Sequence, residues 1–107
     1  MKRQLIIDLE TSALTPEVGD IVRFRAASVS DPDDEFDEWV KPPRSLSAEA
    51  ERLIGTTNDR LAHCRPMHDA LADFLDFIDG AELIGDQLDF DLGFLKAAIS
   101  ASAPRQP

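Results

Sequence analysis

The sequence has a single cysteine, Cys64, and no long apolar run. One cysteine can form neither an intrachain disulfide framework nor a cysteine-based zinc site, so zinc fingers are excluded. A membrane span needs about 20 apolar residues, and Asp8 ends the N-terminal apolar run far short of a signal peptide's hydrophobic region. We therefore expect a cytoplasmic protein without a membrane partner.

Basic residues are scarce as well. The chain has 11 Lys and Arg against 21 Asp and Glu, which gives a formal net charge of −10. Proteins that coat nucleic acid broadly present a basic surface, so this balance argues against such a role. It is compatible with an enzyme whose carboxylates hold cations that in turn hold phosphate, and also with a plain acidic domain. The length of 107 residues predicts one domain, 1–107.

Apolar patterning predicts an α/β domain. Strands are expected at 3–9, 20–30, 36–40 and 81–84, two short helices at 48–63, a longer helix from Pro66 to residue 79, and a last helix at 91–100. Short connections favour antiparallel pairing of the first three strands. The helical crossover requires the fourth strand to run parallel to one of them. The predicted fold is therefore a mixed sheet of three antiparallel strands plus one parallel strand, with helices packed on it.

Three carboxylates follow predicted strands. Asp8 and Glu10 end the first strand, where the two-residue period places both on one face, and Asp91 follows the fourth strand. Ligand sites in open sheets gather beyond the carboxyl ends of strands, so the three converge if these strands are neighbours. Hard oxygen ligands suit Mg²⁺ or Mn²⁺, and two such ions would make the site phosphate-binding. Alternatively, Asp8 and Glu10 are simply the polar end of a strand, and Asp91 caps the last helix, a role that is compatible with metal binding.

Three ordered segments resemble one known family. IIDLETSALTP from Ile6 to Pro16 resembles the first motif of the DEDD-type 3′-to-5′ exonucleases, which include the proofreading exonuclease subunit of DNA polymerase III. LSAEAERLIGTTNDRL from Leu46 to Leu61 is similar to the family's middle segment, and FDLGFLKAAI from Phe90 to Ile99 to its second acidic motif. The order and spacing of the three matches together imply the family's ribonuclease H-like fold.

The resemblance also implies roles for individual residues. Asp8, Glu10 and Asp91 would be catalytic residues that bind two Mg²⁺ or Mn²⁺ ions, with Glu10 also orienting the attacking water. Thr11 and Leu14 would hold the terminal nucleotide. The implied reaction is two-metal hydrolysis that removes nucleoside monophosphates from the 3′ end of DNA or RNA.

The sequence also departs from the family's pattern. Family members continue to a third motif with a general base and another aspartate, whereas this sequence ends at Pro107, so we expect a fold incomplete at its C-terminus and weak or no activity. Asp86 and Gln87 stand where the family commonly has His-Asn, and Arg23 and Arg25 stand where it has acidic or small residues. The alternative is a non-catalytic relic of the fold that serves as a protein interaction module. Because the fold would be incomplete at its C-terminus, one sheet edge would be exposed, and we expect a homodimer or a protein partner to cover it.

Overall fold

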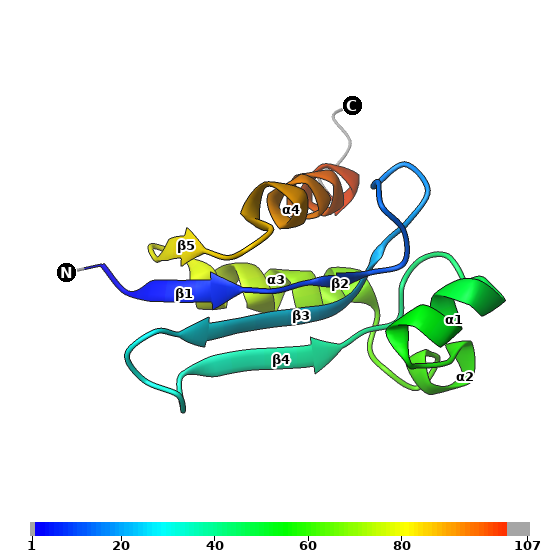
Figure 1. Ribbon diagram of the computed structural model, residues 1–107, viewed down its shortest axis with the longest axis horizontal. Coiled ribbons are helices and arrows are strands. Elements are labelled where there is room, and N and C mark those ends of the chain that lie inside the picture. The colour runs from blue at the N-terminus through cyan, green and yellow to red at the C-terminus, as the bar shows by residue number, and fades with distance from the viewer. Residues whose placement is uncertain (1, 103–107) are drawn as a thin grey trace.

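The computed structural model describes residues 2–102, which form a five-stranded sheet and four helices (Figure 1). In chain order the elements are β1 (Gln4–Ile7), β2 (Glu10–Thr11), β3 (Ile21–Ser28), β4 (Glu35–Trp39), α1 (Ala48–Ile54), α2 (Asn58–Leu61), α3 (Met67–Ile78), β5 (Glu82–Ile84) and α4 (Leu88–Ser102). The predicted α/β class is confirmed. Within residues 2–102, no helix is both long and apolar enough to span a membrane.

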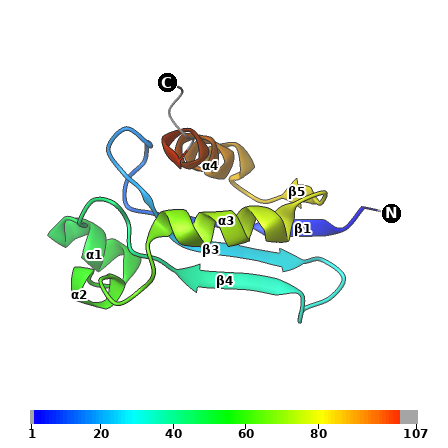
Figure 2. The same ribbon diagram turned by 180° about the vertical axis from the view of Figure 1, so that it is seen from behind.

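The sheet is mixed, as predicted. The central strand β3 pairs antiparallel with β1 and β2 along one side and with β4 along the other. β1 also pairs with β5, and this pair is parallel. The long helix α3 lies behind the sheet in Figure 1 and in front of it in Figure 2, so it covers one face, while α1 and α2 lie beyond the end of β4. The three antiparallel strands plus one parallel strand are therefore confirmed, with the two-residue β2 added to them.

Alternation along the first strand decides which side chains are available for chemistry. Leu5, Ile7 and Leu9 are buried on the helix-covered side, whereas Ile6 is 48% exposed and Asp8 is exposed on the opposite face. Successive side chains of a strand point to opposite faces, so burial of the apolar set places Asp8 outside the core. We call the face that carries Ile6 and Asp8 the open face.

Aromatic rings form the centre of the main core. Phe24 of β3 and Phe74 of α3 are fully buried with ring centroids 4.9 Å apart. Phe36 of β4 packs edge-on against Phe74 at 5.3 Å. Burying a side chain of this size contributes about 1.5–3 kcal/mol, so these contacts tie α3 firmly across the sheet.

Capping residues mark the N-terminal ends of the short helices α1 and α2. The hydroxyl of Ser47 accepts a hydrogen bond from the Ala50 N–H at 3.0 Å, and that of Thr57 accepts one from the Arg60 N–H at 3.1 Å. Gly55 ends α1 with φ of 82°, a left-handed conformation that glycine adopts without steric cost. Both predicted helices are confirmed.

Several element boundaries differ from the prediction: β3 spans Ile21–Ser28 rather than 20–30, and α2 ends at Leu61 rather than at residue 63. The expected first strand at 3–9 is shorter, because β1 spans only Gln4–Ile7, and pairing resumes beyond the expected range at Glu10, with a register shift between Glu10 and Thr11. The last helix begins at Leu88 rather than at Asp91. Its extra turn is supported by Phe90, whose ring packs at a tilt against that of Phe94, with centroids 5.2 Å apart, within the same helix.

Candidate functional site

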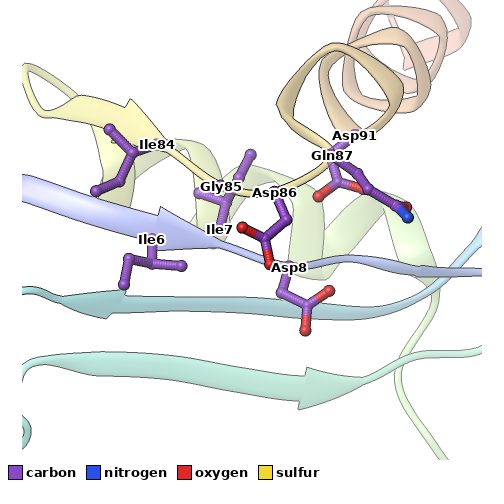
Figure 3. Close-up of a pocket in the computed structure, with 8 residues that line it drawn as sticks. All are labelled: Ile6, Ile7, Asp8, Ile84, Gly85, Asp86, Gln87 and Asp91. Atoms are coloured by element: carbon purple, nitrogen blue, oxygen red, sulfur yellow. The ribbon is translucent and has the colours of Figure 1, made fainter.

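An open pocket of about 620 Å³ lies at the carboxyl ends of the parallel strands β1 and β5. It is lined by Ile6, Ile7, Asp8, Ile84, Gly85, Asp86, Gln87 and Asp91. Figure 3 shows the side chains of Asp8, Asp86 and Asp91 gathered where β1 ends and α4 begins. Because neighbouring parallel strands end at the same edge, the two acidic segments meet here although 82 residues separate Leu9 from Asp91.

Gly85 lets the two strand ends approach each other closely. A Cβ atom at this position would lie 2.8 Å from the carbonyl oxygen of Ile7. Real Cβ atoms essentially never come so close to another heavy atom, so any larger residue would push β5 away from β1. The chain from β5 to α4 therefore passes directly over the end of β1, which brings Asp86 and Asp91 to the pocket.

Asp91 is the buried carboxylate of the site, with 3% of its surface exposed. Burial raises its pKa, and the negative charge of Asp8 raises it further, while a 3.4 Å hydrogen bond from the Leu9 N–H to its Oδ2 opposes the shift. Asp91 lies within α4 and accepts this hydrogen bond from the strand segment. The suggested role of Asp91 as the cap of the last helix was therefore wrong, since the helix begins three residues earlier.

Asp8 lies on the open face with 63% of its side chain exposed. Its backbone N–H donates to the Arg25 carbonyl at 3.0 Å, and Arg25 Nη2 donates to its Oδ2 at 2.5 Å. The carboxylate is thus already paired with a guanidinium from the neighbouring strand. Sequence reasoning noted Arg25 as an unusual residue but did not foresee this contact, which depends on the register between β1 and β3.

Glu10 is not among the residues that line the pocket. It is half-buried opposite Arg23 of β3, whose guanidinium is held by Asp37 through two 2.8 Å hydrogen bonds and stacks on Trp39. Glu10 Oε2 is buried and has no hydrogen-bond partner among the described residues. A buried acceptor without a donor is costly, so an external donor or a cation would stabilise it.

Thr11 is the last residue of β2, and Leu14 lies in the loop that follows it. The Thr11 hydroxyl donates to the Ala13 carbonyl at 3.0 Å, and Leu14 is 83% exposed. Neither residue lines the pocket. Their loop is held from outside by Arg44, which donates to the Asp20 carboxylate and to the carbonyls of residues 16, 17 and 19.

The donor chemistry of the site suits a hard divalent cation. Asp8 and Asp91 present carboxylate oxygens to one pocket, and Glu10 offers a buried oxygen without a partner nearby. Across residues 2–102, however, no three Asp, Glu, His or Cys side chains are arranged to hold an ion as they stand. Asp86, which the sequence analysis noted as a departure from the family's pattern and not as a metal ligand, adds a further carboxylate to the pocket. The metal-ligand roles of Asp8, Glu10 and Asp91 therefore remain predictions.

Comparison with known proteins gives a family match and several similar structures. The RNase_T model, described as an exonuclease, matches residues 5–106. DNA polymerase III PolC-type of Lactococcus lactis subsp. lactis is 31% identical over 93 residues, covering 85% of this chain and 6% of that protein. The chain therefore spans only a small part of this curated relative.

Two solved structures share the architecture. Escherichia coli Exonuclease I in complex with a dA16 oligonucleotide superposes with a TM-score of 0.77 at 15% identity, covering 94% of this chain and 24% of that one. A 3′-exonuclease that recognises the histone mRNA stem-loop superposes with a TM-score of 0.75 at 22% identity, covering 100% of this chain and 56% of that one. These likenesses confirm the predicted fold.

Proposed function

The chain belongs to the RNase_T exonuclease family, with the ribonuclease H-like fold of the DEDD-type 3′-to-5′ exonucleases, and on this premise we propose that it acts on the 3′ ends of nucleic acids. The reaction is hydrolysis of the terminal phosphodiester bond, assisted by Mg²⁺ or Mn²⁺. The observation that carries the proposal is the meeting of Asp8 and Asp91 in one pocket at the ends of β1 and β5. The oligonucleotide and mRNA named for the two similar structures support a nucleic-acid substrate.

Each residue has a distinct part in this proposal. Asp8, Glu10 and Asp91 would hold the divalent cations, and Glu10 would also orient the attacking water with its unpartnered oxygen. Bound divalent ions would stabilise both the attacking water and the leaving oxygen. Thr11 at the end of β2 and the exposed Leu14 in the following loop would hold the terminal nucleotide.

Substrate binding should depend on the cation. Three carboxylates, Asp8, Asp86 and Asp91, line the pocket, and the chain's net charge is −10. Without divalent ions these charges repel phosphate, because like charges disfavour one another at short range. We therefore expect nucleic acid to bind detectably only when Mg²⁺ or Mn²⁺ is present.

The activity of this 107-residue chain by itself should be weak. Asp8 is paired with Arg25, and neither His63 nor His68 lines the pocket, so no histidine in residues 2–102 is placed there as a general base. A general base contributes about 10²–10⁴ in rate. The same Asp8–Arg25 pair favours a second candidate function, a non-catalytic interaction module that keeps the fold.

A nuclease assay tests the first function. The chain with Mn²⁺ should slowly shorten 5′-labelled single-stranded DNA or RNA from the 3′ end, and Asp8→Asn and Asp91→Asn should each abolish this. Asp89→Asn is the matched control, because Asp89 is exposed in the first turn of α4 and does not line the pocket. Intact substrates after long incubation at high enzyme concentration would favour the interaction module instead.

A further inference from the structure

Arg25 is placed to compete with a metal ion for Asp8. It lies on β3 beside the end of β1, and its Nη2 donates to Asp8 Oδ2. The Asp8 N–H also bonds to the Arg25 carbonyl, so the two residues are held side by side through the backbone as well. The contact is thus built into the register of the sheet, and it does not depend on a mobile loop.

The Asp8–Arg25 pair leaves two nearby polar atoms without hydrogen-bond partners. Arg25 Nε and Glu10 Oε2 are both buried without a hydrogen-bond partner among the described residues. The guanidinium therefore neutralises Asp8 but does not supply the donor that Glu10 lacks. A cation bound between Asp8 and Glu10 would give the buried Glu10 oxygen a partner. The same cation would compete directly with Arg25 for the Asp8 carboxylate.

Other carboxylates lie beside Arg25 on the neighbouring strand β4. Asp37 is its cross-strand partner on β4, and a hollow of about 280 Å³ on the open face is lined in part by Asp8, Arg25, Glu35 and Asp37. The pKa of Asp37 is lowered chiefly by its hydrogen bond with Arg23, and the charge of Arg25 adds to this effect. Both oxygens of Asp37 already accept hydrogen bonds from Arg23, so Asp37 could receive the released guanidinium only as a shared partner, whereas Glu35 is a second carboxylate of β4 that lines the same hollow.

We propose that Arg25 is an internal counter-ion of Asp8 that sets the affinity of the site for divalent cations, because a cation binds only when the guanidinium turns away from Asp8. The inference rests on the proposed function, since it assumes that Asp8 is a metal ligand. In the metal-free protein the pair makes the site less negative. Metal binding then carries the cost of breaking the pair.

The test is calorimetric titration of MnCl₂ into the wild-type chain and the Arg25→Gln variant. The variant should bind Mn²⁺ roughly three- to tenfold more tightly, since a partly exposed ion pair and one unit of repelling charge are removed. Arg65→Gln is the charge-matched control. Arg65 pairs with Glu38 and Asp73 on the surface, so its removal changes the net charge equally but should leave the affinity unchanged.

Two further variants separate the possible failures. Asp8→Asn combined with Arg25→Gln should lose the tight binding, and Arg25→Met, which retains an apolar stem for packing on the sheet, should reproduce the gain if Arg25→Gln fails to fold. Equal affinity of wild-type and Arg25 variants, with binding lost in Asp8→Asn, would overturn the role of Arg25 and leave the metal site standing. Absence of Mn²⁺ binding in every protein would overturn both proposals.

Discussion

The N–H of Leu9 donates to Oδ2 of Asp91 across 3.4 Å, which ties the buried carboxylate of α4 to the segment between Asp8 and Glu10. This contact joins two parts of the chain that are far apart in sequence. It places the acidic start of α4 against the end of β1, and the pocket forms between them.

Asp91→Asn should stabilise the protein at neutral pH. Burial raises the pKa of Asp91 above its ordinary value of 3.8, so the folded state binds the proton more tightly than the unfolded state does. The unfavourable charge therefore costs stability as the pH rises above 3.8, and the cost disappears below it. Urea unfolding should show that Asp91→Asn gains stability at pH 7 and that the gain shrinks toward pH 3.

Asp89→Asn provides the control for this comparison, because Asp89 is exposed on the same turn of α4. It should show no such pH-dependent gain. Loss of stability in Asp91→Asn at pH 7 would mean that the hydrogen bond from Leu9 outweighs desolvation of the carboxylate.

Gly85→Ala should destabilise the protein by about 1–3 kcal/mol, the usual cost of forcing extra atoms into a packed region. The added Cβ would meet the Ile7 carbonyl at 2.8 Å and separate β5 from β1. Gly93→Ala is the contrasting control, since a Cβ there meets nothing within 4 Å and the position is helical. That change should stabilise by roughly 0.5–1 kcal/mol. Chemical denaturation measures both, and equal effects would contradict the close approach at Gly85.

Arg44→Ala should loosen the loop that carries Leu14. Arg44 bonds the Asp20 carboxylate and three backbone carbonyls of this loop, and the Asp20 N–H in turn donates to the Ser12 hydroxyl at 2.9 Å. Hydrogen exchange followed by mass spectrometry should show several-fold faster exchange in residues 12–20. Arg65→Ala removes another surface arginine and should leave this loop protected. Unchanged exchange in Arg44→Ala would show that the loop is held by its own turns.

Phe74→Ala should destabilise the protein by about 3–5 kcal/mol, because it leaves a large cavity. Phe74 is fully buried between the rings of Phe24 and Phe36. Leu53→Ala removes an apolar side chain that is 76% exposed, so its effect should stay within about 0.5 kcal/mol. Thermal unfolding of the two variants gives the comparison, and similar midpoints would contradict the assignment of the core.

Self-association remains a prediction that solution measurements can decide. In the described residues β5 is the outermost strand beside β1, so its other edge has no neighbouring strand. Unpaired edges invite pairing with another chain. Multi-angle light scattering should show a dimer at high concentration, and a clean monomer over a wide concentration range would refute it.

Local chemistry alone determined much of the fold. Ser47, Gly55 and Thr57 mark helix ends by interactions within a few residues, and the apolar alternation of β1 gives the buried side of the strand. The sequence therefore predicted the mixed sheet and every element except the two-residue strand β2. The errors lay at boundaries such as the start of α4, where the tilted contact between the rings of Phe90 and Phe94 supports an extra turn of helix.

Which residues come together in the site was decided by the tertiary structure. The sequence placed Asp8 and Asp91 after strands, but only the parallel pairing of β1 with β5 brings them into one pocket. The pairing of Arg25 with Asp8 and the separation of Glu10 from the pocket likewise depend on the register between strands. Capping and alternation are short-range effects that the sequence determines by itself. Register and strand order arise from packing between distant segments, and so they appear only in the folded chain.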